Sequence, residues 1–126
     1  MSKVQTGLRY SEEHEWLDTD AAPAKIGVSA VAADALGDVV YLDLPEVGSE
    51  LTAGTTCGEI ESTKSVSDLY SPVSGTVVEI NQEAIDNPAL VNEDPYGAGW
   101  LFTVEVTSEG PLLSPEEYAS KNGGEL

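Results

Sequence analysis

The stretch Leu101-Phe102-Thr103-Val104-Glu105-Val106 shows the pattern that decides the fold of this chain. Apolar side chains fall at alternate positions, so Phe102, Val104 and Val106 face one way and the residues between them face the other. This alternation is typical of a β-strand, because successive side chains of a strand point to opposite faces of the sheet. We therefore predict a strand here, with one face turned to a core.

Two further segments alternate in the same way and extend the prediction from one strand to a sheet. In the segment Asp38 to Leu44, the side chains predicted to point inward are Val40, Leu42 and Leu44. In the segment Thr76 to Ile80, the side chains predicted to share one face are Val78 and Ile80.

Turn signals separate these segments. They are Pro45-Glu46-Val47-Gly48, Ala53-Gly54 and Ser71-Pro72-Val73-Ser74-Gly75. Short strands between closely spaced turns favour a mainly β fold, arranged as a small sandwich or a flattened barrel.

Two short helices are predicted to interrupt the strands. Ser29 is placed to cap a helix over Ala30–Leu36, and Gly37 is placed to end it. Near the C-terminus, Ser114-Pro115-Glu116-Glu117 has Ser at a capping position, Glu three residues later and Pro at the first helical position. Asn122-Gly123 then supplies a stop for this second helix.

The composition is strongly acidic. In 126 residues, 23 Asp and Glu stand against five Lys and Arg, and the formal net charge is −18. Such a chain repels nucleic acid and anionic lipid, whose binding depends on Lys and Arg. The acidity instead favours solubility, basic partner proteins or a salty cell interior, and composition does not choose among these.

Other gross features indicate one cytoplasmic domain. The length fits a single domain, and the lone cysteine, Cys57, excludes an intramolecular disulfide. The N-terminal residues lack the apolar stretch of a signal peptide, and apolar runs of about 18 residues, the length of a membrane span, do not occur.

Lys64 is the residue that the predicted turns single out. Gly54 lies ten residues before it and Gly75 eleven residues after it, so Lys64 falls where a hairpin would have its tip. Small hydroxyl residues surround Lys64. A lysine amine has an ordinary pKa of about 10.4 and reacts poorly until an enzyme deprotonates it. An exposed hairpin tip with small neighbours would present it to such an enzyme, although an arbitrary turn lysine is more often merely solvated.

The sequence around Lys64 resembles the lipoylation site of glycine cleavage H proteins. The matching segment is Glu61-Ser62-Thr63-Lys64-Ser65-Val66-Ser67-Asp68. Upstream, the similarity continues through His14-Glu15-Trp16, Leu36-Gly37-Asp38-Val39-Val40-Tyr41 and Leu44-Pro45-Glu46-Val47-Gly48. Downstream, it continues through Tyr70-Ser71-Pro72-Val73-Ser74-Gly75, Val91-Asn92 and Asp94-Pro95-Tyr96-Gly97-Ala98-Gly99-Trp100. These segments occur in family order and cover nearly the whole chain.

The resemblance implies a flattened barrel or sandwich hybrid of the lipoyl/biotinyl-domain type, with residues 1–126 as a single lipoyl-carrier domain. It also implies a carrier rather than an enzyme, with lipoate joined covalently to Lys64 as N6-lipoyllysine. In the family, lipoate accepts an aminomethyl group from a pyridoxal-phosphate glycine decarboxylase and delivers it to a folate-dependent aminomethyltransferase. Dihydrolipoyl dehydrogenase then reoxidises it, and a lipoate ligase or a lipoyl/octanoyl transferase attaches it.

Three carboxylates are the other candidate site residues that the resemblance implies. Glu61 would contribute to recognition of the modification site. Glu15 and Asp68 match positions near the cleft that shelters the loaded arm, where they could pair with a cationic amine, but both could equally be solvated strand-end carboxylates. The chain departs from the family at Thr63, where valine is usual, and at Ala35, where many members carry histidine.

The remaining chemistry-bearing residues are expected to be structural. The chain has one histidine, His14, and one cysteine, Cys57, so its sequence offers no nucleophile–base set and no convincing metal site. We expect His14 to make a structural hydrogen bond and Cys57 to pack as a small apolar residue. The aromatic residues Trp16, Tyr96 and Trp100 are expected to be packing residues.

Two other carrier classes fit less well, and one remains open. Lipoyl domains of 2-oxo acid dehydrogenases usually show Asp-Lys-Ala at the site, and biotin carriers place methionine on both sides of the lysine, whereas Met1 is the only methionine here. A lipoylation hub, which donates lipoate to other complexes, is the alternative that the sequence leaves open.

Overall fold

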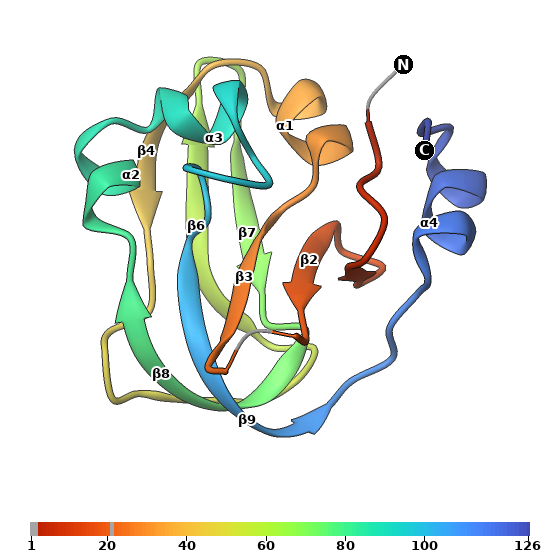
Figure 1. Ribbon diagram of the computed structural model, residues 1–126. Coiled ribbons are helices and arrows are strands. Elements are labelled where there is room, and N and C mark those ends of the chain that lie inside the picture. The colour runs from red at the N-terminus through yellow and green to blue at the C-terminus, as the bar shows by residue number, and fades with distance from the viewer. Residues whose placement is uncertain (1–2, 21) are drawn as a thin grey trace.

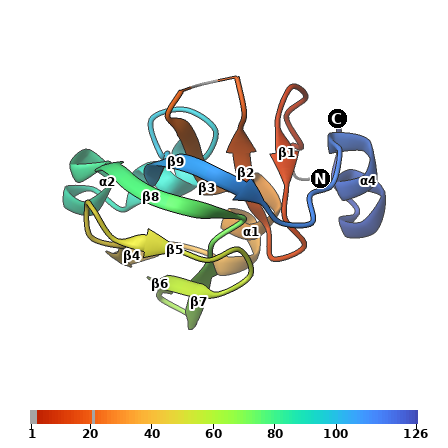
Figure 2. The ribbon, with the colours of Figure 1, turned by 90° about the horizontal axis from the view of Figure 1, so that it is seen from below.

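The computed structural model describes residues 3–20 and 22–126, which form two antiparallel sheets and several short helices. The larger sheet has the spatial order β1 (Arg9–Tyr10), β2 (Glu15–Asp18), β3 (Ala24–Val28), β9 (Phe102–Glu109), β8 (Val73–Ile80), β5 (Glu50–Leu51). The smaller sheet has the order β4 (Val39–Asp43), β6 (Thr56–Ser62), β7 (Val66–Tyr70). The two sheets lie as separate layers and do not close into a barrel (Figures 1 and 2), so the sandwich form of the prediction is the one adopted.

The predicted strand is β9, which lies inside the larger sheet between β3 and β8. Phe102 and Val104 are fully buried, and the half-buried Val106 packs against the same core. The prediction for this strand is therefore confirmed. Thr103, on the opposite face, is also buried.

Two predicted inward side chains, Val40 and Val78, are exposed instead, with 51% and 43% of their surface accessible. The register of β4 against β6 shifts between Val39 and Tyr41, and that of β8 against β9 shifts between Val77 and Glu79. A β-bulge inserts one extra residue and so breaks the alternation of faces. Val39 and Val77 are consequently the buried residues next to these bulges.

The predicted turn over 71–75 is shorter than its sequence suggests, because β8 already begins at Val73. Gly75 lies inside β8 beside another register shift, and a Cβ at this position would collide with the Glu105 carbonyl oxygen and the Val104 side chain. Glycine here permits the close approach of β8 to β9 rather than marking a turn.

Both predicted helices are present with the expected ends. In α1 (Ala30–Leu36) the Ser29 side chain accepts a hydrogen bond from the Ala32 N–H, and Gly37 ends the helix with φ +78°. In α4 (Pro115–Asn122) the capping box is formed and Gly123 adopts the left-handed conformation.

Two five-residue helices, α2 (Gln82–Asp86) and α3 (Ala89–Glu93), were not predicted from the sequence. Neither has a side-chain hydrogen bond at its N-cap: Pro88 has no capping group, and the Asn81 side chain donates instead to the Ala98 and Trp100 carbonyl oxygens. Among residues 3–20 and 22–126, no helix is long and apolar enough to span a membrane.

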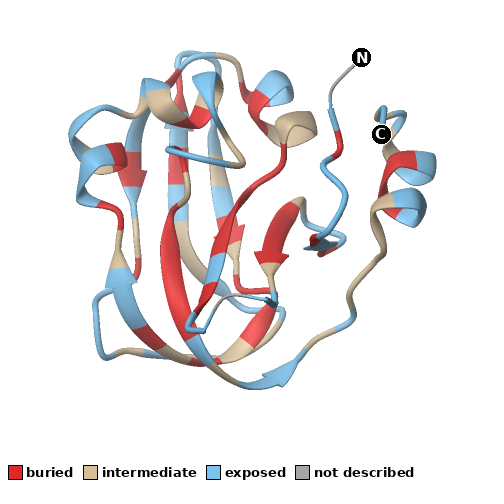
Figure 3. Ribbon diagram, viewed as in Figure 1, coloured by how far each residue is buried: buried red, intermediate tan, exposed pale blue. Residues whose placement is uncertain are grey.

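Two clusters of buried side chains form the core. The main cluster fills the space between the sheets and includes Leu17, Ile26, Leu42, Ile60, Leu69, Val77 and Phe102. The second lies beneath α4 and contains Val4, Leu8, Tyr10, Trp16, Tyr118 and Ala119. Figure 3 shows the buried residues concentrated on β2, β3 and β9, the strands that contribute to these clusters. The main cluster thereby anchors the smaller sheet, which contains the β6–β7 hairpin.

Candidate functional site

Lys64 lies in the three-residue turn between β6 and β7 and is exposed, at the tip that the sequence predicts. The Ser62 N–H donates to the Ser65 carbonyl oxygen at 2.8 Å. The buried Ser62 hydroxyl accepts hydrogen bonds from the Lys64 and Ser65 N–H groups, both at 3.2 Å. The turn is thus clamped by backbone and hydroxyl contacts that do not involve the Lys64 side chain.

The end of α1 supports this tip from behind. The Thr63 N–H donates to the Asp38 carbonyl oxygen at 3.0 Å. A Cβ at Gly37 would lie only 3.1 Å from Lys64 Cε, so the lysine stem runs close over this glycine. Thr63 itself is exposed, which explains why a hydroxyl can replace the usual valine methyl group at this position.

Asn92, on α3, ties the end of α1 to the start of β4. Its Oδ1 accepts from the Val39 N–H at 2.9 Å, and its Nδ2 donates to the Gly37 carbonyl oxygen at 2.7 Å. In the sequence, Val91-Asn92 was recognisable only as part of the family resemblance. The structure places Asn92 as a support for the segment on which Lys64 rests.

A cleft of about 210 Å³ opens beside the tip, between α1 and β7. Its walls include apolar side chains from several elements, and it is lined by Val28, Ala32, Ala35, Leu36, Ile60 and Leu69 together with polar residues. Ala35 belongs to this lining, so the departure from histidine removes a polar side chain from the cleft wall. The cleft is therefore suited to an apolar chain.

Glu15 and Asp68 both line this cleft, and the structure therefore brings these two candidates together. Glu15 is 1% exposed, so of the two alternatives given for this residue the solvated strand-end carboxylate is wrong. The Ser11 hydroxyl donates to Glu15 Oε1 at 2.6 Å, and the Tyr70 N–H donates to Oε2 at 3.3 Å. Burial nevertheless outweighs these bonds and raises the pKa of Glu15 to about 8.

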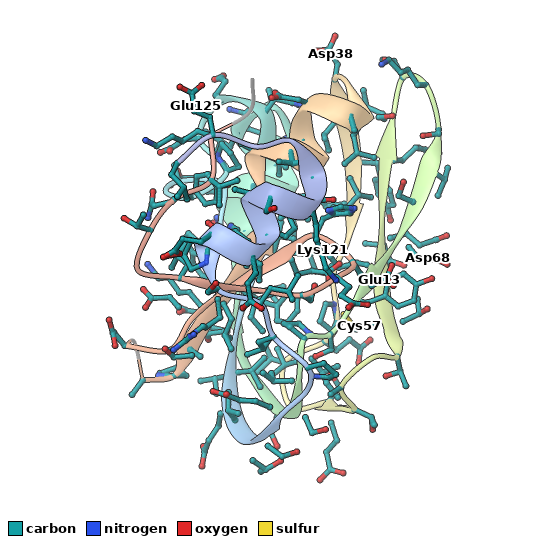
Figure 4. The ribbon with its side chains drawn as sticks, turned by 90° about the vertical axis from the view of Figure 1, so that its right-hand side faces the viewer. Glu13, Asp38, Cys57, Asp68, Lys121 and Glu125 are labelled. Carbon is teal, nitrogen blue, oxygen red and sulfur yellow. The ribbon has the colours of Figure 1, made fainter. Side chains whose placement is uncertain are left out.

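Asp68 and Glu13 lie at the rim of the cleft. Asp68 is exposed on the edge strand β7, and Glu13 is exposed in the loop before β2. Figure 4 shows both on the same side of the molecule. Glu13 was not predicted as a site residue, and the only sequence signal for it is its place beside the His14-Glu15-Trp16 match.

Glu61, the candidate recognition residue, lies on a different surface from Glu15. It is exposed on β6, in register with Tyr41 of β4 and Val66 of β7. Glu61 does not line the cleft. The structure thus buries Glu15 in the cleft, places Asp68 at the cleft rim on the exposed edge strand β7, and places Glu61 beside the hairpin tip.

His14 makes the structural hydrogen bond that was expected. Its Nδ1 lies 2.7 Å from the hydroxyl oxygen of Tyr118, which in turn lies 2.6 Å from Ser29 Oγ. Burial lowers the pKa of His14 below its ordinary value. Through this contact, α4 is connected to the cleft wall.

The other residues expected to be structural also pack. Cys57, half-buried on β6, packs against the main core, and burial raises the pKa of its thiol to about 12. Trp16 is buried in the second cluster, and Tyr96 and Trp100 pack against it. These expectations are confirmed.

Residues 8–122 match the family described as glycine cleavage H-protein. The chain belongs to this family. It is 55% identical over 123 residues to the glycine cleavage system H protein of Thermobifida fusca, covering 97% of this chain and 98% of the relative. It is 58% identical over 118 residues to the H protein of Streptomyces avermitilis, covering 92% and 94%.

A solved structure of the H-protein family has the same fold. The crystal structure of a glycine cleavage system H protein from Mycobacterium marinum superposes with a TM-score of 0.91 at 48% sequence identity. The alignment covers 95% of this chain and 99% of that one. The arrangement of the two sheets is therefore an H-protein arrangement.

Proposed function

We propose that this chain is the lipoyl carrier of a glycine cleavage system, with lipoate attached to Lys64 as N6-lipoyllysine. One observation carries the proposal: in a member of the H-protein family, an exposed lysine at a clamped hairpin tip stands beside a cleft. Residues 1–126 act as one carrier domain, and the chemistry belongs to partner enzymes rather than to this chain.

The residues present fit a lipoyl group. Among residues 3–20 and 22–126, the Lys64 amine has no ion pair that modification would break. Attachment requires the Lys64 Nζ to lose a proton to a base of the attaching enzyme and to attack the carbonyl carbon of an activated lipoyl donor. An amide bond forms and the activating group leaves with its bonding electrons. The net charge moves from −18 to −19, because one cation is lost.

When bound, the lipoyl group supplies a redox-active disulfide that takes up and releases the one-carbon fragment of glycine. The chain's residues hold and shelter it. The apolar walls of the cleft, including Leu36 and Ile60, exclude water from the arm, and the rim residues Glu13 and Asp68 attract a cationic amine. A cationic amine in the cleft would lower the pKa of Glu15, because a positive neighbour stabilises the carboxylate.

Four kinds of partner follow from this proposal. They are a pyridoxal-phosphate glycine decarboxylase, an aminomethyltransferase, dihydrolipoyl dehydrogenase, and a lipoate ligase or lipoyl/octanoyl transferase. The carrier works in the cytoplasm, and neither nucleic acid nor a membrane is a partner. Tethering raises the effective concentration of the carried fragment at each enzyme.

Peptide mapping after treatment with a lipoate ligase, lipoate and ATP tests the site. Lys64 should carry the lipoyl group, while Lys3, Lys25 and Lys121 stay unmodified. Intact mass of protein made with and without lipoate gives the stoichiometry, which should be one group per chain. Acylation at another lysine with Lys64 unmodified would refute the proposal.

A further inference from the structure

The outer face of the smaller sheet carries a row of exposed side chains next to the Lys64 turn. Tyr41 pairs with Glu61 across β4 and β6, and Glu61 pairs with Val66 across β6 and β7. Tyr41 and Val66 each have 55% of their surface accessible, which is high for an aromatic and a branched apolar residue. Val66 begins β7 immediately after the turn, so this row borders the modification site.

A second row lies one step further from the turn and contains only carboxylates. Asp43 of β4 pairs with Glu59 of β6, and Glu59 pairs with Asp68 of β7. All three are exposed, and within residues 3–20 and 22–126 none has an ion pair. Like charges directly opposite each other destabilise a sheet. The free chain therefore bears a repulsion that a cationic surface would relieve.

We propose that this surface is a docking face for the enzyme that acylates Lys64. The docking face consists of Tyr41, Asp43, Glu59, Glu61, Val66 and Asp68. Its partner presents Lys or Arg side chains to the carboxylate row and an apolar contact to Tyr41 and Val66. This inference rests on the proposed function and extends it to the way in which the modifying enzyme recognises the chain.

The attaching enzyme fits this face better than the enzymes that use the finished arm. An unmodified lysine is short, so the enzyme must bring its activated acyl carbon to the hairpin tip itself and contact the flanks of the hairpin. One flank is occupied by the end of α1, where Gly37 lies under the lysine stem. The docking face is the open flank. Enzymes that act at the far end of a lipoyl arm can work without touching it.

Acylation kinetics of two matched double variants test the docking face. D43N/E59Q removes two charges from the carboxylate row, and E79Q/E105Q removes two exposed charges from β8 and β9 of the other sheet. With a lipoate ligase, lipoate and ATP, D43N/E59Q should lose about fivefold in kcat/KM, mainly through KM, as expected for two exposed ion pairs. The loss should shrink as salt screens the charges, and E79Q/E105Q should match the parent chain.

Thermal unfolding separates recognition from damage to the fold. D43N/E59Q should have a higher Tm than the parent chain, because the repulsion along the row is removed. Tyr41→Thr, which replaces one residue that favours strands with another, should lower kcat/KM at every salt concentration. Slower acylation of a more stable protein is a result that a merely structural role would not give.

Three outcomes would overturn the inference. The docking face is wrong if D43N/E59Q is acylated at low salt as fast as E79Q/E105Q. It is also wrong if the loss is independent of salt and accompanied by a lower Tm. With either of these two outcomes, acylation of the parent chain at Lys64 would still support the proposed function. A parent chain that is never acylated at Lys64 would defeat the proposed function together with the inference.

Discussion

Hydrogen bonds made by neighbouring residues and by backbone groups hold the Lys64 turn in place. The Lys64 side chain contributes little to this. The Ser62 hydroxyl and the Asp38 carbonyl oxygen hold the turn, while the lysine stem passes over Gly37. Because other groups hold the turn, the Lys64 side chain can be replaced without loss of the fold. The proposed function, in contrast, requires the Lys64 amine.

Lys64→Arg should consequently fold like the parent chain and carry no lipoyl group. Arginine keeps the charge and much of the length, but its guanidinium, which stays protonated, does not form the lipoyl amide. A substitution at an exposed position away from special features changes stability by about 0.5 kcal/mol or less. Intact mass, thermal unfolding and reconstituted glycine decarboxylation measure the three consequences. A variant that still turns over glycine would contradict the carrier role, and one that melts far lower would show that Lys64 is structural.

Glu15 should make the stability of the chain depend on pH. Its pKa is about 8 in the folded protein and ordinarily 4.5, so the folded state binds more protons than the unfolded state between these values. The stability that Glu15 contributes is therefore complete below about pH 4.5 and is lost as pH rises towards 8. Over that window the loss is roughly 1 kcal/mol per pH unit.

Glu15→Gln removes this titration and tests it directly. Urea unfolding at several pH values should show the variant gaining stability over the parent chain as pH rises, with Glu105→Gln, an exposed control, tracking the parent. His14, whose pKa is lowered, titrates in both proteins and cancels from the comparison. A constant difference between Glu15→Gln and the parent at all pH values would mean that Glu15 has an ordinary pKa.

At the scale of elements, α3 positions the hairpin through Asn92. Asn92→Ala leaves the Val39 N–H and the Gly37 carbonyl without their partner, which should lower the free energy of unfolding by about 1–3 kcal/mol. The Thr63 amide, bonded to Asp38, should also lose protection against hydrogen exchange.

The exposed Asn87 provides the control for this change. Asn87→Ala should leave both readouts near the parent values, whereas Asn92→Asp, which keeps the acceptor for Val39 but not the donor to Gly37, should fall between. Unchanged exchange at Thr63 in Asn92→Ala would show that the tip stands without this support.

The helices and strands that could be predicted correctly are those whose sequence signals, such as capping residues, lie within or next to the element itself. Ser29 with Gly37, and Ser114 with Gly123, bound their helices by local capping, and both helices occur as expected. The bulges that turn Val40 and Val78 outward depend on the partner strand, so alternation alone could not reveal them. Helices α2 and α3 have no side-chain hydrogen bond at their N-caps, and the Asn81 side chain bonds the distant Ala98 and Trp100 carbonyl oxygens instead.

The residues of the candidate site also fall into those that local sequence predicts and those that depend on distant contacts. The position of Lys64 followed from turn residues on either side of it, which are local. The burial of Glu15 depends on packing against Ser11 and on the distant Tyr70, and no local pattern indicated it. The register that aligns Asp43, Glu59 and Asp68 likewise arises from pairing between strands.

For the whole molecule, the acidic surplus should cost stability that salt restores. With a net charge of −18 and a sequence pI near 4.1, the folded chain repels itself at neutral pH. Raising NaCl from roughly 0.02 M to about 0.3 M shortens the screening length severalfold and should raise Tm. D43N/E59Q/E79Q/E105Q removes four carboxylates, moves the net charge to −14 and should show a smaller rise. Differential scanning calorimetry of both proteins over the same salt series measures the effect.

An equal rise in Tm for both proteins would assign the salt effect to something other than charge repulsion. A Tm that does not change with salt would mean that the acidic surplus does not destabilise the folded state.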